Sequence, residues 1–416
     1  MTQPPPQAKS LWARSLYWTI SVLAFSIFYR AYVHNVLFVT LGLGRQVQPL
    51  EDFPWKCTRQ YDPLLQGCED MWLDHNDRKL YAACSTIESR QGWTPGGNKY
   101  DLSARSLSDH IAVLDIDNVD PESGLSVPRQ LKIGGYEGAL DLHGFDVRHI
   151  GSTVRFWLIN HKPAVDAATG QPLDAWTHGA NSTVEIFDLN KITDTLEHVR
   201  TVYSDAIISP NNLAVDADGV GFVITNDHKG KTGRFRDLEM LYGTGSLTYC
   251  RSDTGECNVA AKSGFRMPNG IAKGRDGLYY VAHSVTGHVT VHKLEGDQLK
   301  QVDTIQMGYP VDNISFDEDG SLIAAAIPDS FQFMKSADHP HDIDAPATVL
   351  ATPIKGKDGE WKVLKIVEDA LAIKLPSSTV AVQDTRTSRL FLGGVFAPFI
   401  TVCEKQEPVS PDEHSR

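Results

Sequence analysis

From Pro54 onward the chain alternates short apolar runs with acidic and glycine turns, and it shows no long helical periodicity. The runs are rich in Val, Ile, Phe and Tyr and are punctuated by Asp-Gly and Gly-Gly, a pattern typical of strands and hairpins. One unit recurs: a small or hydroxyl residue, alternating apolar positions and then an acidic or glycine turn, at residues 111–117, 182–190, 245–253, 287–297, 347–359 and 399–405. The pattern predicts an all-β fold.

The spacing of these units is close to the length of a four-stranded blade, about 40–50 residues. It predicts a six-bladed β-propeller over residues 46–405. We expect residues 70–84 to complete the blade that ends at residues 399–405. A long β-sandwich is the structural alternative, although a sandwich does not require six equivalent units.

Three polar segments interrupt the strand pattern. Residues 85–108 and 164–180 are rich in Gly and Pro, which predicts loops over one face of the propeller. Residues 227–244 are similar but contain a helix-like stretch at residues 236–242. The tail after Glu404 is polar, and we expect residues 406–416 to be disordered.

The first 45 residues have a different pattern. Residues 16–29 and 31–44 are apolar and are separated by Arg30, with Lys9 and Arg14 ahead of them. No small-x-small cleavage site is evident, so the pattern favours an uncleaved hydrophobic anchor helix that spans a membrane. A buried helix and a cleaved signal peptide are the alternatives. The anchor predicts a membrane-bound or secreted protein with its propeller in the lumen or outside the cell.

Charge and cysteine usage agree with that location. The formal net charge of −13 argues against nucleic acid as a partner and is compatible with cation binding. Six cysteines fit an oxidising compartment. Cys250 and Cys257 flank one turn and Cys68 and Cys84 flank one hairpin, which leaves Cys57 and Cys403 to tie the chain ends together. Free buried thiols are equally compatible with the even count. Asn181 begins a glycosylation sequon, Asn-Ser-Thr, in a polar loop.

Short motifs with polar side chains recur immediately before strand-like runs: Glu69-Asp70, His143-Gly144-Phe145, Asn211-Asn212, Asn269-Gly270 and Asp312-Asn313. The central channel of a propeller is lined where each innermost strand begins, so these side chains would converge there. Carboxylates and amides without a His/Cys ligand cluster suit a hard cation such as calcium. Each motif taken alone is equally explained as a turn former.

Eight motifs in order, GCEDMWLD, DLHGFDV, LINHKP, STVEIF, SPNNLAV, TNDHKG, MPNGIA and VDNISFD, closely resemble the serum paraoxonase/arylesterase family. The resemblance extends from Cys57 to Cys403. It implies a six-bladed propeller, two calcium ions in the channel, a retained hydrophobic N-terminus and one disulfide that joins the chain ends. It further implies a carboxylic ester hydrolase that prefers lactones, with aryl esters and phosphotriesters as side activities.

The resemblance also assigns roles to residues. The ligands of a catalytic calcium would be Glu69, Asn211, Asn269, Asp312 and Asn313. A structural calcium would be held by Asp70, Asn212 and the backbone carbonyl of Phe145, with help from Asp227. Asn212 departs from the family, which usually has Asp at this position, and one negative charge fewer should weaken the second ion's site.

His143 and His161 match the family's proposed histidine dyad. A neutral imidazole can accept a proton from the attacking water while a second ring orients it, and calcium would draw charge onto the carbonyl oxygen. Glu69 and Asp312 are alternative bases. His283 and His288 would line the pocket or lie at the surface.

Other features of the sequence prevent the natural substrate from being inferred from the family resemblance. Ile327 stands where mammalian relatives carry a pocket histidine, and residues 85–108 and 164–180 have no evident counterpart in those relatives. The expectation is therefore a calcium-dependent lactonase or arylesterase with a small lactone or ester substrate. A gluconolactonase-like sugar lactonase and a non-enzymatic, calcium-stabilised luminal binding propeller are the rivals.

Overall fold

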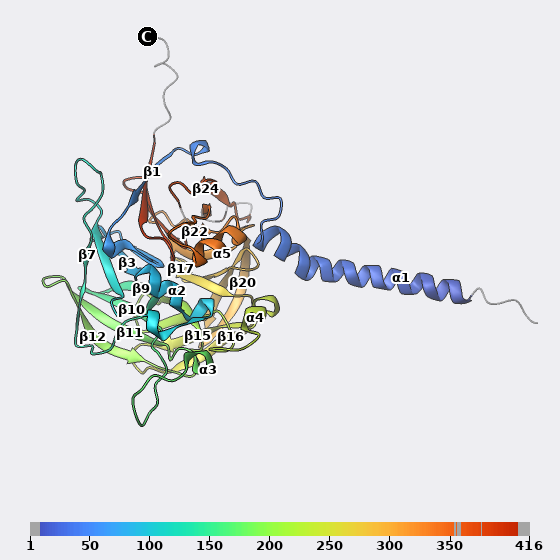
Figure 1. Ribbon diagram of the computed structural model, residues 1–416, viewed down its shortest axis with the longest axis horizontal. Coiled ribbons are helices and arrows are strands. Elements are labelled where there is room, and N and C mark those ends of the chain that lie inside the picture. Colours follow the sequence, from blue (N-terminus) through green and yellow to red (C-terminus); the bar gives the residue numbers. More distant parts are fainter. Residues whose placement is uncertain (1–8, 353–354, 356–358, 376, 407–416) are drawn as a thin grey trace, which may run out of the picture.

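The computed structural model describes residues 9–352, 355, 359–375 and 377–406. Strands dominate it, and they form six sheets of four or five strands each around a common centre (Figure 1). The innermost strands contact one another in a ring, in the order β2, β9, β13, β17, β21 and β25, and β25 contacts β2 again. The predicted six-bladed β-propeller is confirmed.

The first three blades follow one another along the chain. The strands of each blade are given in order from the channel outward. They are β2 (Asp70–Asp74), β3 (Lys79–Cys84), β6 (His110–Asp115) and β7 (Arg129–Gln130); β9 (Leu142–Ile150), β10 (Thr153–Asn160), β11 (Thr183–Asn190), β12 (Thr195–Val202) and a parallel β8 (Lys132–Gly134); and β13 (Pro210–Val215), β14 (Gly221–Asn226), β15 (Gly245–Arg251) and β16 (Cys257–Phe265).

The other three blades have the same order. They are β17 (Pro268–Lys273), β18 (Tyr279–His283), β19 (His288–Glu295) and β20 (Gln298–Gln306); β21 (Val311–Phe316), β22 (Leu322–Ala326), β23 (Ala347–Thr352) and β24 (Leu364–Asp369); and β25 (Val380–Asp384), β26 (Arg389–Gly393), β27 (Ile400–Lys405) and β1 (Trp55–Gln60).

The hydrophobic core lies between neighbouring blades. Six clusters of buried apolar side chains each combine residues from two adjacent blades. Middle strands such as β14 and β22 are buried along their whole length because a neighbouring blade covers each face. This explains why β22 is continuously apolar and why β14 carries three consecutive large apolar residues, rather than an alternating pattern.

The last blade is closed by a strand that the sequence analysis did not identify. We expected residues 70–84 to complete it, and that prediction is wrong, because they form β2 and β3 of a separate blade. The closing strand is β1, which pairs antiparallel with β27 and places Cys57 opposite Cys403. β1 has two apolar residues, Trp55 and Cys57, and alternates buried with exposed side chains, so it is an outer strand with a weak sequence signal.

The structure contains three disulfides, Cys57–Cys403, Cys68–Cys84 and Cys250–Cys257. The first joins the two ends of the propeller across a sequence separation of 346 residues. This is the pairing that the family resemblance implied. Three disulfides and no free cysteine among the described residues indicate an oxidising compartment such as the secretory pathway.

Short helices lie in the insertions. Residues 85–108 hold α2 (Ile87–Gly92) and a small hairpin of β4 (Trp93–Thr94) and β5 (Lys99–Tyr100); α3 (Ala175–His178) and α4 (Arg236–Tyr242) follow in the other two predicted segments. The helix expected at residues 236–242 is therefore present. The sequence analysis missed α5 (Ser330–Asp338), whose Ala337 packs with Phe396.

The N-terminal helix α1 (Lys9–Phe28) projects away from the propeller (Figure 1). Among the described residues, no helix combines the length and apolar character needed to cross a membrane. The predicted membrane-spanning anchor is therefore not supported. Thr19, Ser21 and Ser26 interrupt the first apolar run, and Arg30 separates it from the second. Residues 407–416 of the predicted tail lie outside the described residues.

Candidate functional site

Five of the six innermost strands carry the predicted site residues within their first four residues or just before them. Glu69 precedes β2 and Asp70 begins it; the other positions are His143 and Phe145 in β9, Asn211 and Asn212 in β13, Asn269 in β17, and Asp312 and Asn313 in β21. All of them are buried. Side-chain hydrogen bonds across the channel join Asn212 to Asp70, Asn212 to Asn313 and Asn313 to Glu69. The fold thus brings these separate motifs together at one end of the channel.

Two glycines in the motifs allow neighbouring strands to approach closely. A Cβ at Gly144 would lie 2.6 Å from the backbone oxygen of Asn211, and one at Gly270 would lie 2.6 Å from Cα of Asn313. Any larger residue would push the innermost strands apart at these two points. The His-Gly-Phe and Asn-Gly motifs therefore hold their polar neighbours against the next blade.

Four residues form what we call the oxygen cluster: Glu69, Asn211, Asn269 and Asp312. Three of its buried oxygens have no hydrogen-bond partner, namely Oε2 of Glu69 and Oδ1 of Asn211 and Asn269. Buried polar atoms are normally paired, so such a group points to a missing ligand. These atoms are acceptors only, and a hard cation is the ligand that oxygen acceptors from several strands would hold. The residues present therefore fit the calcium ion that the family resemblance implies.

The charges of the cluster support the same assignment. Burial, opposed by the charge of Arg90 and a hydrogen bond from Asn313, raises the pKa of Glu69 to about 7 in the absence of a cation. Burial and the nearby charge of Glu69 also raise the pKa of Asp312 well above its usual range. A bound divalent cation would stabilise the ionised form of both carboxyl groups.

The predicted ligands of a second ion are placed differently. Asp70 accepts hydrogen bonds from the backbone amides of Met71 and Phe145 and from the side chain of Asn212. Neither of its oxygens is left without a partner. The Asp70–Asn212 pair is thus satisfied within the protein, and the side chains do not fit a second cation as they stand.

His143 and His161 lie side by side next to the oxygen cluster. Their ring centroids are 5.2 Å apart, and Nε2 of His143 is 3.8 Å from Oε1 of Glu69. Nδ1 of His161 bonds to Oγ of Ser182 at 2.9 Å, which fixes the orientation of that ring. Nδ1 of His143 and Nε2 of His161 have no hydrogen-bond partner. Each ring therefore keeps one nitrogen available to a substrate or a water molecule.

Burial keeps both rings neutral. Desolvation, with a smaller contribution from the charge of Arg90, lowers the pKa of His143 to about 3. Desolvation and the neighbouring ring of His143 hold the pKa of His161 well below its usual range. Neutral imidazoles can accept a proton, whereas imidazolium ions cannot.

Residues 85–108, which we call the cap, cover the two histidines. Nε1 of Trp93 donates to the backbone oxygen of His161 at 2.9 Å. Arg90 is buried and donates to the carbonyl oxygens of Gly67, just before β2, Ala83, near the end of β3, and Leu142, at the start of β9. The cap is therefore anchored directly to the site and is more than a surface loop.

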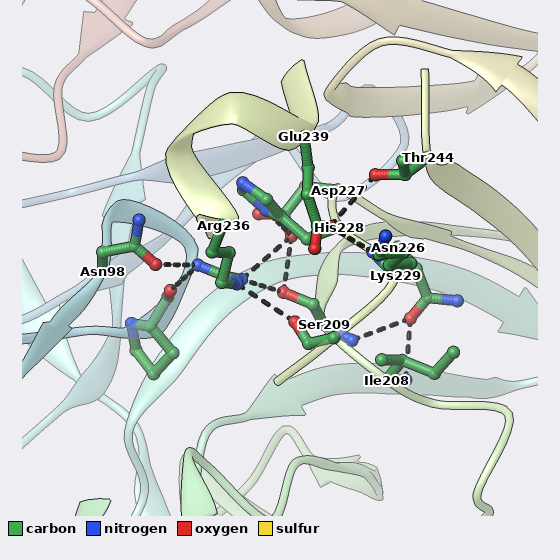
Figure 2. Close-up of polar contacts among 12 residues, drawn as sticks. Asn98, Ile208, Ser209, Asn226, Asp227, His228, Lys229, Arg236, Glu239 and Thr244 are labelled. Atoms are coloured by element: carbon green, nitrogen blue, oxygen red, sulfur yellow. Dashed lines mark hydrogen bonds and ion pairs between the residues drawn. The ribbon is translucent and has the colours of Figure 1, made fainter. Parts of the chain in front are cut away.

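A second buried guanidinium fastens the cap from α4 (Figure 2). Arg236 donates to the backbone oxygen of Pro95 at 2.7 Å and to Oδ1 of Asn98, and on its other side it bonds to Ser209 and lies 3.5 Å from Asp227. Asp227 also binds Nδ1 of His228 at 2.8 Å. Although burial opposes it, the charges of His228 and Arg236 lower the pKa of Asp227 to about 2. Asp227 thus holds the cap in this structure, a role that the sequence analysis did not foresee.

Sequence reasoning missed the residues that support the site. Arg90 and Arg236 lie in segments that were interpreted as loops, and Ser182 lies in the Asn-Ser-Thr sequon. Nothing in their spacing indicates burial. The single signal was the helix-like stretch around Arg236, which predicted a helix but not the buried side chain.

Two other groups have ordinary structural explanations. Asp74, Asp77 and His149 are close enough to hold a metal, but Asp74 already accepts bonds from His149 and from the backbone amides of residues 76 and 77. His283 is buried within its own blade, where it contacts His288 and bonds to Thr290. The surface alternative for His283 is therefore wrong.

Comparison with known proteins identifies the family. The profile of the family described as arylesterase matches residues 172–401, more than half of the chain. The chain belongs to the arylesterase family. The resemblance predicted from its motifs is confirmed.

The relatives are distant. The chain is 29% identical over 238 residues to serum paraoxonase/arylesterase 2 of Gallus gallus, covering 55% of this chain and 60% of that protein. It is 32% identical over 159 residues to serum paraoxonase/lactonase 3 of Oryctolagus cuniculus, covering 37% of this chain and 44% of that protein. The matched region thus spans 60% or less of these two relatives.

Solved structures give weaker matches. A putative gluconolactonase aligns with a TM-score of 0.47 at 12% identity, over 87% of this chain and 99% of that one. A luciferin-regenerating enzyme aligns with a TM-score of 0.48 at 12% identity, over 84% of this chain and 95% of that one. At these TM-scores the similarity carries no functional argument.

Proposed function

We propose that this arylesterase-family protein is a calcium-dependent hydrolase of lactones and aryl esters. The observation that carries the proposal is the set of three buried, unpartnered oxygens of Glu69, Asn211 and Asn269 beside two neutral histidines. A calcium ion bound by the oxygen cluster would polarise the substrate carbonyl and stabilise the negative charge that develops on its oxygen. Asn313, whose Oδ1 already accepts from Asn212, would support the cluster through its hydrogen bond to Glu69.

The chain's own residues supply the proton transfer. His143 accepts a proton from the attacking water through its unpartnered Nδ1, and Glu69 lies 3.8 Å from its other nitrogen. His161, oriented by Ser182, is positioned to hold His143 and the water in place. The cap, fastened by Arg90 and Arg236, excludes bulk water from the histidines and must shift to admit a substrate.

The location of the protein follows from the same features. Three disulfides favour a luminal or extracellular propeller. Glycosylation of Asn181, which is partly exposed in the structure, stays a prediction. The division of the chain into residues 1–45, 46–405 and 406–416 is likewise a proposal.

A substrate panel tests this function. The full chain is stripped of metal, and hydrolysis of a δ-lactone, glucono-1,5-lactone and phenyl acetate is measured before and after calcium is restored. We expect activity on the δ-lactone and phenyl acetate that depends on calcium. Preference for the sugar lactone would favour the gluconolactonase-like alternative, and no turnover of any substrate would favour the binding propeller.

A matched pair of variants tests the site. Asp312→Ala removes a carboxylate of the oxygen cluster and should abolish turnover. Asp319→Ala removes an exposed carboxylate from the turn after the same strand and should leave turnover unchanged. Full activity of the metal-stripped protein, or of Asp312→Ala, would contradict the proposed mechanism.

A further inference from the structure

The amide group of Asn212 bridges two oxygens inside the channel. Its Nδ2 donates to Oδ2 of Asp70 at 3.1 Å and to Oδ1 of Asn313 at 2.8 Å. All three side chains are buried. An amide nitrogen is a donor without a lone pair for a metal, so the atom that Asn212 presents to Asp70 cannot bind a cation.

The orientation of this amide is determined by its other contact. Oδ1 of Asn212 accepts a hydrogen bond of 2.7 Å from the backbone amide of Leu213. Rotating the amide by half a turn would place an N–H group against the N–H of Leu213 and an oxygen against the carboxylate of Asp70. Both changes would lose a hydrogen bond and add a repulsion in a buried place. The nitrogen therefore faces Asp70.

Both oxygens of Asp70 accept hydrogen bonds from groups of the protein. Oδ1 accepts from the backbone amide of Met71 at 2.9 Å, and Oδ2 accepts from the backbone amide of Phe145 at 3.0 Å as well as from Asn212. In contrast, Glu69 next to it keeps one oxygen without any partner. Two adjacent carboxyl groups thus have opposite environments, one open to a cation and one closed by hydrogen bonds.

The far side of Asp70 also disfavours a second cation. A cavity of about 240 Å³ reaches Asp70 and Asn212 from the other part of the channel, and its lining includes Arg148, Lys273 and Arg275. Arg148 is paired with Asp146 and Lys273 with Asp216. Asp146 and Asp317 line the same cavity, so its acidic and cationic side chains balance and it offers no excess of carboxylates to a second divalent ion.

We propose that this protein holds one calcium ion rather than two, and that the Asn212 amide takes the place of the second ion by linking Asp70 to Asn313. The inference rests on the proposed function, which supplies the first ion at the oxygen cluster. The linkage continues from Asn313, whose Nδ2 donates to Oε1 of Glu69 at 2.9 Å, and so it connects the closed pair to the cluster. Asn212 therefore supports the shape of the calcium site without binding the ion.

The test counts calcium ions per chain. The full-length protein is stripped of metal, titrated with calcium by calorimetry, and its calcium content is measured after gel filtration in excess calcium. We expect one ion per chain for the wild type and two for Asn212→Asp, because the new carboxylate replaces the donor that faces Asp70. Asn118→Asp, which adds the same charge at an exposed turn, is the control and should hold one ion.

The possible results separate the two proposals. Two ions in the wild type, or one ion in a folded Asn212→Asp variant, would overturn this inference and leave the proposed function intact. No ion in the wild type would overturn the proposed function, and this inference with it. The number of calcium ions bound by the wild type tests this inference even if Asn212→Asp does not fold without calcium. In that case a rise in thermal midpoint on adding calcium that exceeds the wild-type rise supports the inference.

Discussion

The oxygen cluster and the Asp70–Asn212 pair lie next to each other in one channel and consist of the same residue types. In the cluster, oxygens from three blades have no partner, and beside them two neutral histidines each keep a free nitrogen. In the pair, every oxygen of Asp70 is hydrogen-bonded to a backbone or side-chain N–H. The two regions differ in where the hydrogen-bond donors lie: N–H groups reach both oxygens of Asp70, but none reaches the three unpartnered oxygens of the cluster. Residue composition alone does not distinguish a metal site from a hydrogen-bonded core.

The largest effect that tests this comparison is expected from removal of calcium. Stripping the metal should eliminate ester hydrolysis and lower the thermal midpoint, because it leaves buried carboxylates and amide oxygens of the cluster without a partner. At a calcium concentration 100 times the dissociation constant, the ion adds about 2.7 kcal/mol to the free energy of unfolding. Thermal unfolding and activity are measured in chelator, in calcium and in magnesium, with recovery expected in calcium. An unchanged midpoint would mean that the cluster holds no ion.

The next effect is expected from the histidine beside the cluster. His143→Gln should lower kcat by about 10²–10⁴-fold, the usual contribution of a general base. Calcium content should stay at the wild-type value, because His143 is not one of the proposed ligands. His178→Gln, at an exposed position of α3, is the control and should leave kcat unchanged. A kcat within twofold of wild type for His143→Gln would assign the base to another residue.

Glu69→Gln tests the oxygen cluster directly. It removes one carboxylate from the proposed ligands and should weaken calcium binding by at least about 100-fold, the upper range seen for residues that merely orient a ligand. Calcium affinity is measured by calorimetry. Glu88→Gln, an exposed change in α2, should bind calcium with wild-type affinity. Equal affinities of the two variants would contradict the assignment of Glu69.

The smallest effect on calcium binding is expected from Asp70→Asn, in the Asp70–Asn212 pair. An amide at this position has one acceptor oxygen instead of two, so it should lower the free energy of unfolding by about 1–3 kcal/mol. The number of bound calcium ions should not change. Chemical unfolding and calcium content are measured on the same preparation. Loss of the ion in Asp70→Asn would show that the two regions form one metal site.

Parts of the fold could be predicted from local patterns. Repeated strand-turn units gave the number of blades, because each unit corresponds to the third strand of one sheet, counted from the channel. The closing strand β1 escaped prediction because Trp55 and Cys57 are its only apolar residues, so its strand pattern is weak. The anchor helix was predicted from apolar residues at 16–29, but the helix in the structure is α1 (Lys9–Phe28), whose polar positions interrupt that run.

The sequence by itself determined the family, the propeller and the set of polar residues that meet at the channel. It did so because strand beginnings carry recognisable motifs, and a propeller brings strand beginnings together. Only the tertiary structure decided which oxygens remain without a partner, that Arg90 and Arg236 fasten the cap, and that the nitrogen of Asn212 faces Asp70. These depend on contacts between blades that are far apart in the chain, and no local pattern encodes the direction of an amide group.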